Sequence, residues 1–522
     1  MSAPRVAMLV ANGVAGDSRV QKAAWSMAEA GWDVVLVGRA AGDRREEYAL
    51  GRARVLLVPL EDELSGYQKV RPRRSEAVRR RAAYRAARAR TARWDAADSG
   101  GPAVRAAAAA RGRLERWPAG DALVGRLGSG RVGGPAALAA GAVRGLADRN
   151  GGWRSFNPWF RDLELAFAPV LAELRPDLIH AHDFHMVGIG ARAAGRLGVP
   201  WVYDAHEYLA GIDVPGRWYR RSELRGLLRR RMLVGVEREY IGRADAVVTV
   251  SRGIAERLRA DHGLAAEPLV IANAPMRHGG AEAAPQQEST AGEGAAGAAV
   301  SLREAVGLGP ETPLLVYSGG MAPRRGVASV VEGLARLERA HLALVAREDD
   351  PDVPALLTLA ERLGVAGRVH TAPYVSPDRV VEYIASADAG LIPILHRPNH
   401  ELSLITKYLE YLHAGLPIVC SDVRTMARTT EELGVGEVYP AGDPAGFAEA
   451  AGRVLDGIER YRAQYLPGRP GAAAAEEYRW SRQAEALDAL YARLLGRRPE
   501  LTDGEQGLPA GGLTLCPVGS AG

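Results

Sequence analysis

A lysine and a glutamate near the start of a predicted helix carry the clearest chemistry in this chain. Lys407 and Glu410 lie three residues apart in the segment 399–421, NHELSLITKYLEYLHAGLPIVCS. Side chains at that spacing share one helical face, so an ordinary ion pair is one interpretation. The other is a binding site, because a cation, a carboxylate and the positive end of a helix dipole suit a ligand with phosphate and hydroxyl groups. A nucleotide sugar is such a ligand.

Two adjacent arginines, Arg324 and Arg325, stand in a glycine-rich turn between a predicted strand and a predicted helix. Guanidinium groups present paired N–H donors that match the geometry of phosphate oxygens. A solvated turn is the alternative interpretation, and the sequence by itself favours neither.

Histidines and an aspartate follow one another in HAHDFH, at His180, His182, Asp183 and His185. These are typical metal ligands, so a zinc or binuclear hydrolase site is one interpretation. The two-residue period of a strand sends His180 and His182 to one face and Asp183 to the other. We therefore predict no metal site, with His182 and Asp183 lining a cleft and His180 structural.

A second polar group follows the apolar strand at 200–204. Asp204, His206 and Glu207 stand at its carboxyl end, where open α/β sheets keep their ligands. A histidine that merely closes a strand end is the alternative, and the position favours a functional His206.

The glycine loop after the first predicted strand contains Gly13 and Gly16 and is followed by Asp17. It lacks the third glycine of a dinucleotide fingerprint, and the chain has no Walker-type P-loop. Asp17 is either an N-cap for the first helix or a side chain directed at a ligand.

Short apolar runs alternate with amphipathic helical stretches in two series, one starting at residue 5 and one at residue 314. This alternation is typical of βαβ units, and 522 residues exceed a single core. We predict an α/β protein with two doubly wound, Rossmann-like parallel sheets that face a cleft. The predicted parts are residues 1–272 with an Arg/Ala-rich insertion at 69–150, a linker or insertion at 273–312, residues 313–471, a C-terminal helix at 472–496 that crosses back to the first domain, and a disordered tail at 497–522.

Charge is divided unevenly between the halves. Residues 1–272 hold 44 Lys and Arg against 30 Asp and Glu, although the net charge of the chain is only +5. The arginines gather in residues 71–93 and 217–231, the second interleaved with aromatic and leucine residues. A solvated basic face is one interpretation, and docking on an anionic membrane surface is the other. Nucleic acid is the weaker candidate partner.

Cysteine content and hydropathy bear on location. The chain has two cysteines and no apolar run of about 18 residues. The first apolar run breaks at Asn12-Gly13 and is interpreted as a strand, not a signal peptide. We expect a cytoplasmic protein that is peripheral on the inner face of the membrane if the arginines dock there.

The order of several motifs resembles a known family. These motifs are NGVAGDSRVQKAAWSMAEAGWDVVLVG, PDLIHAHDFH, YDAHEY, ADAVVTVS, YSGGMAPRRG and TKYLEYLHAGLPIV, spread over residues 4–60, 153–272 and 313–494. The chain resembles the family 4 (group 1) glycosyltransferases of GT-B fold, which are retaining, use nucleotide sugars and usually need no metal. The resemblance implies no cofactor, a nucleotide-sugar donor bound by the C-terminal domain, and a sugar, lipid-linked or small-molecule acceptor bound by the N-terminal domain.

The resemblance also assigns roles to single residues. It implies that Arg325 and Lys407 bind the donor diphosphate, that Glu410 holds the ribose and that His206 lies against the donor sugar. We count His206, Arg325 and Lys407 as catalytic. The expected donor-binding residues are Gly13, Gly16, Gly319, Gly320, Arg325, Glu401, Ser403, Lys407 and Glu410, and the acceptor-side candidates are Asp17, His182, Asp183 and Glu207.

The sequence departs from the family at one important position. The family has a first glutamate eight residues before the position of Glu410, and here Leu402 stands there. The adjacent Glu401 is the expected substitute. Two alternatives therefore stay open beside a glycosyltransferase: a sugar-nucleotide epimerase or phosphorylase of the same fold, and a non-catalytic protein that docks on membrane or nucleic acid.

Overall fold

The computed structural model describes residues 3–65, 82–91, 94, 158–212, 220–276 and 301–497. Most of the predicted insertion at 69–150, the linker between residues 276 and 301, and the tail after residue 497 lie outside the described residues. The same holds for most of the arginine-rich segment 71–93 and for the first residues of the segment 217–231.

The first half of the chain forms a sheet that is parallel except at one edge. In the described residues it has eight strands in the order β3-β4-β2-β1-β5-β6-β7-β8, and only β3 runs antiparallel to its neighbour. The sequence did not predict this antiparallel edge strand. The strands are β1 (Arg5–Leu9), β2 (Asp33–Arg39), β3 (Glu46–Leu50), β4 (Ala53–Val58), β5 (Leu178–His182), β6 (Trp201–Ala205), β7 (Ala246–Thr249) and β8 (Leu269–Val270).

Both faces of this sheet are covered, as the apolar β1 sequence requires. Successive side chains of a strand point to opposite faces. Accordingly, Val6 and Met8 belong to the core on the α1 side, whereas Ala7 and Leu9 belong to the core under α6 and α7. The helices are α1 (Ser18–Glu29), α6 (Pro158–Leu174), α7 (Asp183–Leu197), α8 (Arg220–Tyr240) and α9 (Arg252–His262).

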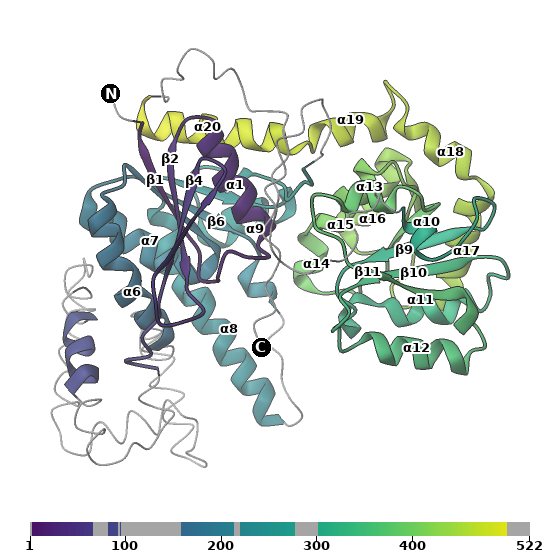
Figure 1. Cartoon of the computed structure of the whole chain (residues 1–522), viewed down its shortest axis with the longest axis horizontal. Coiled ribbons are helices and arrows are strands. Elements are labelled where there is room, and N and C mark those ends of the chain that lie inside the picture. Colours follow the sequence, from purple (N-terminus) through teal and green to yellow (C-terminus); the bar gives the residue numbers. More distant parts are fainter. Residues whose placement is uncertain are drawn as a thin grey trace.

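The second half repeats the architecture with a six-stranded parallel sheet in the order β11-β10-β9-β12-β13-β14, beside the first in Figure 1. Its strands are β9 (Leu314–Ser318), β10 (His341–Ala346), β11 (Val369–Pro373), β12 (Ala389–Ile392), β13 (Ile418–Ser421) and β14 (Gly436–Tyr439). Its helices are α10 (Leu302–Ala305), α11 (Val327–Leu334), α12 (Val353–Arg362), α13 (Val380–Ile384), α14 (Pro398–Leu402), α15 (Thr406–His413), α16 (Arg424–Leu433), α17 (Pro444–Asp456) and α18 (Ile458–Arg462). The predicted fold of two parallel-sheet α/β domains is confirmed.

The C-terminal segment differs from the single helix that the periodicity predicts. It forms two helices, α19 (Pro470–Glu477) and α20 (Trp480–Leu495), because the backbone turns extended at Arg479. The two helices pack on different partners: α19 lies on α15 and α16, whereas α20 runs along α1 of the first half (Figure 1). One straight helix cannot serve both surfaces, so the prediction of one uninterrupted helix is wrong.

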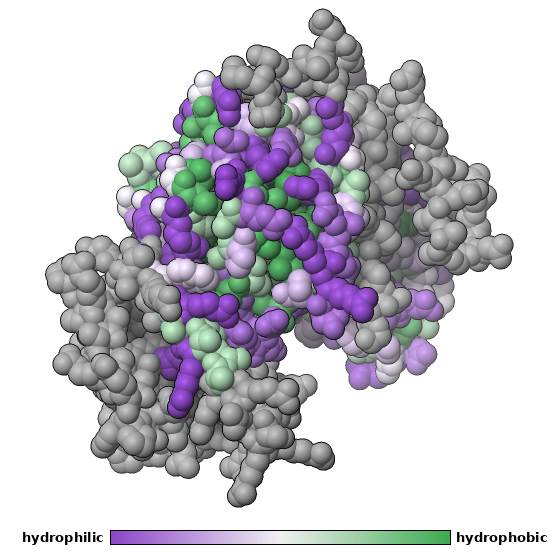
Figure 2. All heavy atoms as spheres, turned by 60° about the vertical axis from the view of Figure 1, so that its left-hand side comes forward, coloured by the Kyte–Doolittle hydropathy of each residue, from purple (hydrophilic) through white to green (hydrophobic). Residues whose placement is uncertain are grey.

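The surface of the first half has no single character. Figure 2 shows hydrophilic residues over most of its described face, with hydrophobic residues between them. Among the residues that the structure describes, no helix combines the length and apolar character needed to cross a bilayer.

Candidate functional site

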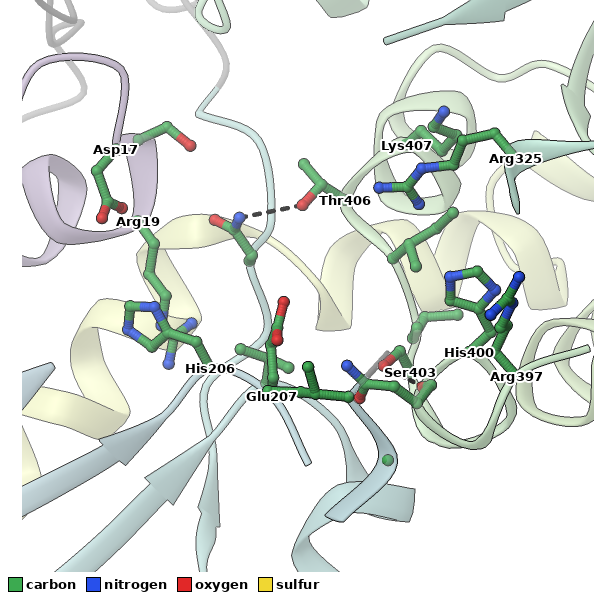
Figure 3. A pocket seen from close by; sticks show the side chains of 18 of the residues that line it. Asp17, Arg19, His206, Glu207, Arg325, Arg397, His400, Ser403, Thr406 and Lys407 are labelled. Carbon is green, nitrogen blue, oxygen red and sulfur yellow. Dashed lines mark hydrogen bonds between the residues drawn. The ribbon is translucent and has the colours of Figure 1, made fainter. Parts of the chain in front are cut away.

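A cavity of about 820 Å³ opens between the two halves. It is lined by Asn12, Ala15, Gly16, Asp17, Ser18, Arg19, His206, Glu207, Gly211, Ile212, Val250 and Asn273 from the first half, and by Arg324, Arg325, Arg397, Asn399, His400, Ser403, Leu404, Ile405, Thr406 and Lys407 from the second. Figure 3 shows Asp17, Arg19, His206 and Glu207 facing Arg325 and Lys407 across it. We call the two sets the N-wall and the C-wall.

Lys407 lies in the first turn of α15, next to the carboxyl end of β9. Its Nζ lies 3.8 Å from the ring centre of Tyr317, the last residue but one of β9. Gly319 leaves room for it, since a Cβ there would lie 3.3 Å from Nζ and the backbone φ of +109° suits only glycine. Burial and then the nearby Arg325 hold the pKa of Lys407 well below its usual value. The amine is therefore costly to charge, and a nearby anion would favour its charged form.

Arg324 and Arg325 end a short 3₁₀ turn, Pro323–Arg325, that is closed by Gly326. Gly326 has φ +71°, and a Cβ there would lie 1.8 Å from the carbonyl oxygen of Pro393. Only glycine allows so close an approach, which fixes the turn against the end of β12. The turn thus delivers two guanidinium groups to the C-wall.

Glu410 lies behind Lys407 on the same face of α15. Burial raises its pKa, while Lys407 and Lys22 of helix α1 oppose that rise. Glu410 is not among the residues that line the cavity. Its predicted contact with a ribose stays a prediction.

The N-wall begins with a tight turn after β1. Asn12 accepts a hydrogen bond from the backbone N–H of Val14 at 2.8 Å and donates to Asp17 Oδ2 at 2.8 Å. Asp17 is also the N-cap of α1, because its other oxygen accepts from the N–H of Val20. One carboxylate thus caps the helix while lining the cavity, so the two interpretations of Asp17 are compatible.

A buried ion pair joins Arg19 of the N-wall to Asp204, which lies behind it. Arg19 donates from Nε and Nη2 to both oxygens of Asp204, at 2.9 and 2.8 Å, and from Nη1 to the carbonyl of Ile271. Both side chains are about 95% or more buried. Burial would raise the pKa of Asp204, but Arg19 and then His206 bring it well below its usual value.

Two histidines share the same carboxylate. His182 Nδ1 lies 3.0 Å and His206 Nε2 lies 3.4 Å from Asp204 Oδ2. Burial lowers the pKa of His182, whereas Asp204 outweighs burial and raises the pKa of His206. Of these two rings, only His206 lines the cavity, so the ring whose pKa Asp204 raises is the one that a ligand in the cavity can contact.

His180, His182 and Asp204 are close enough together to be considered as a metal site. The rings of the two histidines stack at 4.1 Å, as the strand period predicts for one face. Arg19, however, already occupies both oxygens of Asp204, and a divalent cation would be placed beside its positive charge. The donor set fits a buried proton-sharing network better than a metal.

Glu207 is the exposed carboxylate of the N-wall. The surrounding walls remove part of the water around its carboxyl group, and this desolvation and then the charge of Asp183 raise its pKa, while His206 lowers it. Asp183 itself has φ +64°, which is strained for a residue with a side chain, and its oxygens bind Phe184 N–H and His185 Nδ1. Asp183 does not line the cavity directly, and it acts on Glu207 through its charge.

The segment before α15 differs from the loop that the sequence predicts, because residues 398–402 form the short helix α14. This helix turns Glu401 away from the cavity, so that its oxygens accept from His396 Nδ1 at 2.6 Å and from Arg424 N–H at 2.9 Å. The geometry does not support Glu401 as the substitute for the missing first glutamate. Arg397 and His400 face the cavity instead.

The cavity collects seven of the predicted site residues and leaves seven out. Those that line it are Gly16, Asp17, His206, Glu207, Arg325, Ser403 and Lys407, and those that do not are Gly13, Gly319, Gly320, His182, Asp183, Glu401 and Glu410. Within the second set, Gly319, His182 and Asp183 lie directly behind lining residues.

Several lining residues were missed by the sequence interpretation. His400 donates Nδ1–H to the carbonyl of Leu395 at 2.8 Å, which leaves Nε2 as an acceptor for a hydroxyl. Asn273 and Thr406 join the two walls by a hydrogen bond of 3.0 Å. The only sequence feature that could have indicated Asn273 as a lining residue was its place just after a short strand. Arg397 and His400 belong to a polar run that is no different from the sequence of an ordinary loop.

Comparisons with known proteins agree with this architecture. Residues 130–274 match the model of the "Glycosyl transferase 4-like domain", and residues 312–457 match that of "Glycosyl transferases group 1". The chain is 28% identical over 342 residues to a D-inositol 3-phosphate glycosyltransferase of Acidothermus cellulolyticus, covering 62% of this chain and 68% of the relative. It is 24% identical to an MMP alpha-(1->4)-mannosyltransferase of Mycolicibacterium hassiacum, covering 66% and 78%.

Solved structures share the fold at low identity. Sucrose-phosphate synthase from Thermosynechococcus elongatus superposes with a TM-score of 0.60 at 15% identity, covering 94% of this chain and 99% of the other. Anabaena HepE in complex with UDP-glucose superposes with a TM-score of 0.54 at 13% identity, covering 94% and 100%.

Proposed function

Because the chain belongs to the family 4 (group 1) glycosyltransferases of GT-B fold, we propose that it moves a sugar from a nucleotide-sugar donor to an acceptor hydroxyl with retention of configuration and without a metal. That the chain is a glycosyltransferase follows from both family matches. The donor, the acceptor, the stereochemistry and the independence from metal are the proposal.

The observation that carries the proposal is the charge of the C-wall. Arg324, Arg325, Arg397 and Lys407 line it, and the cavity receives no carboxylate from residues 324–407. Desolvation, and then the charge of Arg325, lower the pKa of Lys407, so its ammonium form is disfavoured. A diphosphate would relieve that penalty, since an anion nearby favours the charged amine.

The same cations support the chemical step. When the bond from the anomeric carbon to the diphosphate breaks, negative charge grows on the leaving phosphate oxygens. Arg325 and Lys407 stabilise this charge from fixed positions, which is how preorganised groups lower a barrier. They take the place that a metal ion holds in other phosphate chemistry, so we propose that none is needed.

The N-wall receives the sugar and the acceptor. His206, whose pKa Asp204 raises, can donate a ring N–H to an oxygen of the donor sugar, and Asp17 and Glu207 can accept from hydroxyls. The N-wall and the C-wall together exclude water, which would otherwise hydrolyse the donor. This arrangement supports transfer to an alcohol in preference to water.

A donor screen tests the proposal. Purified full-length protein is mixed with UDP-, GDP-, ADP- and dTDP-sugars, starting with UDP-glucose because a solved relative in fold holds it. We expect one donor to raise the melting temperature and to release nucleoside diphosphate slowly. Lys407→Ala should abolish both effects, whereas Arg428→Ala on the outer face of α16, in an exposed pair with Glu432, should keep them.

The finer claims have separate readouts. Transfer in the presence of a chelator tests metal independence, and the anomeric configuration of the product by NMR tests retention. A product formed without acceptor would instead indicate an epimerase. Donor binding that is equal in Lys407→Ala and the native chain would contradict the assignment of the C-wall.

A further inference from the structure

Four segments from both halves of the chain meet beside the cavity. Helix α1 meets the chain at residues 272–274, the start of α20 and the first turn of α15. Trp480 Nε1 donates to Ser26 Oγ at 2.8 Å, and Ala272 N–H donates to Gln483 Oε1 at 2.9 Å. All the polar links at this junction are buried or partly buried, so the junction is a built contact between the two halves.

Lys22 of α1 stands at the centre of this junction and is 98% buried. Its Nζ donates to Asn273 Oδ1 at 2.9 Å and to the carbonyl of Ala274, and it lies 4.6 Å from the ring centre of Trp480. Within the part of the chain that the structure describes, no carboxylate forms an ion pair with Lys22, and burying a charge in this way is expensive. The proposed reaction does not itself use Lys22.

The ammonium determines the orientation of the next side chain. A protonated lysine can only donate, so the oxygen of the Asn273 amide, which accepts from Lys22 Nζ, faces Lys22 and its NH₂ faces the other way. That NH₂ donates to Thr406 Oγ1 at 3.0 Å, the bond drawn as the dashed line that reaches Thr406 in Figure 3. Thr406 is the first residue of α15 and precedes Lys407. A directed relay therefore runs from α1 to the donor end of the cavity.

We propose that Lys22 is a positioning residue that acts through Asn273 and Thr406 to fix the first turn of α15, and with it Lys407 and Glu410, relative to the N-terminal sheet. The effect of this relay on donor binding depends on the proposed function, whereas the relay itself does not. Without the relay, the distance between the two walls would not be fixed before a ligand binds.

The charges around Lys22 support a role beyond packing. Burial, and then Arg19 on the same helix, lower its pKa to about 7, whereas Glu410 of α15 and Asp17 oppose that shift. Asp204 already takes up the charge of Arg19. The attraction between the Lys22 ammonium and Glu410 is therefore a charge interaction that links the two halves of the chain.

The relay makes a prediction for the unliganded protein. Lys22→Met and Thr406→Val should each speed amide hydrogen exchange in α15 about five- to tenfold, the usual effect of one lost hydrogen bond. Thr406→Ser, which keeps the hydroxyl, should restore most of the protection. The double variant should exchange no faster than the faster single variant, because both changes break one relay.

Ser26→Ala is the matched control, since it removes another hydrogen bond of α1 at the same junction. It should leave exchange in α15 unchanged even if it lowers the melting temperature. Native exchange in α15 of Lys22→Met, or equal acceleration by Ser26→Ala, would overturn the proposal. A gain in the double variant that equals the sum of the single gains would also overturn it.

Two further readouts separate this proposal from the proposed function. UDP affinity should fall about five- to tenfold in Lys22→Met. If the native chain binds no nucleoside diphosphate, the proposed function is refuted, and the hydrogen-exchange experiment still tests the relay.

The pH dependence of stability is the second readout. Because the folded pKa of Lys22 is about 7 and the unfolded value is 10.5, the unfolded chain binds more protons between these values and the free energy of unfolding rises with pH. That slope should flatten in Lys22→Met.

Discussion

The two walls of the cavity hold similar numbers of polar groups but treat their charges in opposite ways. On the N-wall, Arg19 is bound on three nitrogens by Asp204 and Ile271, and Asp204 also serves two histidines. On the C-wall, cations converge without a carboxylate in the lining, and Lys407 is held against its charged form. The buried charges of the N-wall are therefore paired within the protein, whereas we propose that an anion pairs with the cations of the C-wall.

This difference teaches where stability and binding energy are located. A buried charge that loses its partner destabilises the fold, because its desolvation is no longer offset. Removing a charge that faces the cavity should change the stability of the fold little, and should instead weaken the binding of a ligand. Substitutions on the two walls should therefore separate folding from binding.

The largest effect is expected from Asp204→Asn, which leaves Arg19 buried without a counter-charge. We expect a loss of about 3–5 kcal/mol in the free energy of unfolding, measured by urea denaturation. The exposed carboxylate in Asp349→Asn, whose side chain is 77% accessible, should change stability by less than about 0.5 kcal/mol. A mild effect of Asp204→Asn would break the comparison of the walls.

Arg325→Ala should show the reverse pattern. Loss of a charge-assisted hydrogen bond of about 2 kcal/mol weakens binding of the nucleoside diphosphate roughly 30-fold. Titration calorimetry measures that affinity, and the denaturation midpoint should stay close to that of the native chain. A stability loss like that of Asp204→Asn would show that Arg325, too, has a charge partner within the protein.

Donor binding should take up protons. The pKa of Lys407 is lowered by burial and by Arg325, and a bound diphosphate should raise it, so between the two values the complex holds more protons than the free protein. Affinity should then fall as pH rises above the free-state pKa. Calorimetry in two buffers with different ionisation enthalpies measures this uptake, which should vanish in Lys407→Met if Lys407 is its source.

The smallest effect is expected from Glu401→Gln. Its carboxylate is held outside the cavity by His396 and Arg424, so the Michaelis constant for the donor should change less than about twofold. A large rise in that constant would instead support Glu401 as the replacement for the family's first glutamate, and would mean that α14 rearranges on binding.

Local patterns were enough to predict most of the fold. The alternation of apolar strands and amphipathic helices predicted both parallel sheets, and the spacing of Lys407 and Glu410 placed both correctly on one helix. Such features depend on neighbours within a few residues. The edge strand β3 escaped because its pattern of mostly exposed residues is weak.

The predicted helix at 472–496 failed for a tertiary reason. Its apolar period is continuous, and the break at Arg479 arises only because α19 and α20 pack on different halves. Glu401 failed in the same way, since the sequence shows its type but not the direction that α14 gives it.

The sequence by itself determined the chemistry available at this site: the arginine turn, the helix with Lys407 and the histidines at strand ends. Only the tertiary structure decided which charges are already neutralised. Arg19 and Asp204 are 185 residues apart, and Asn273 and Thr406 are 133 apart. Pairings over such distances depend on how strands order within sheets and how sheets face each other, and no local pattern of residues specifies that.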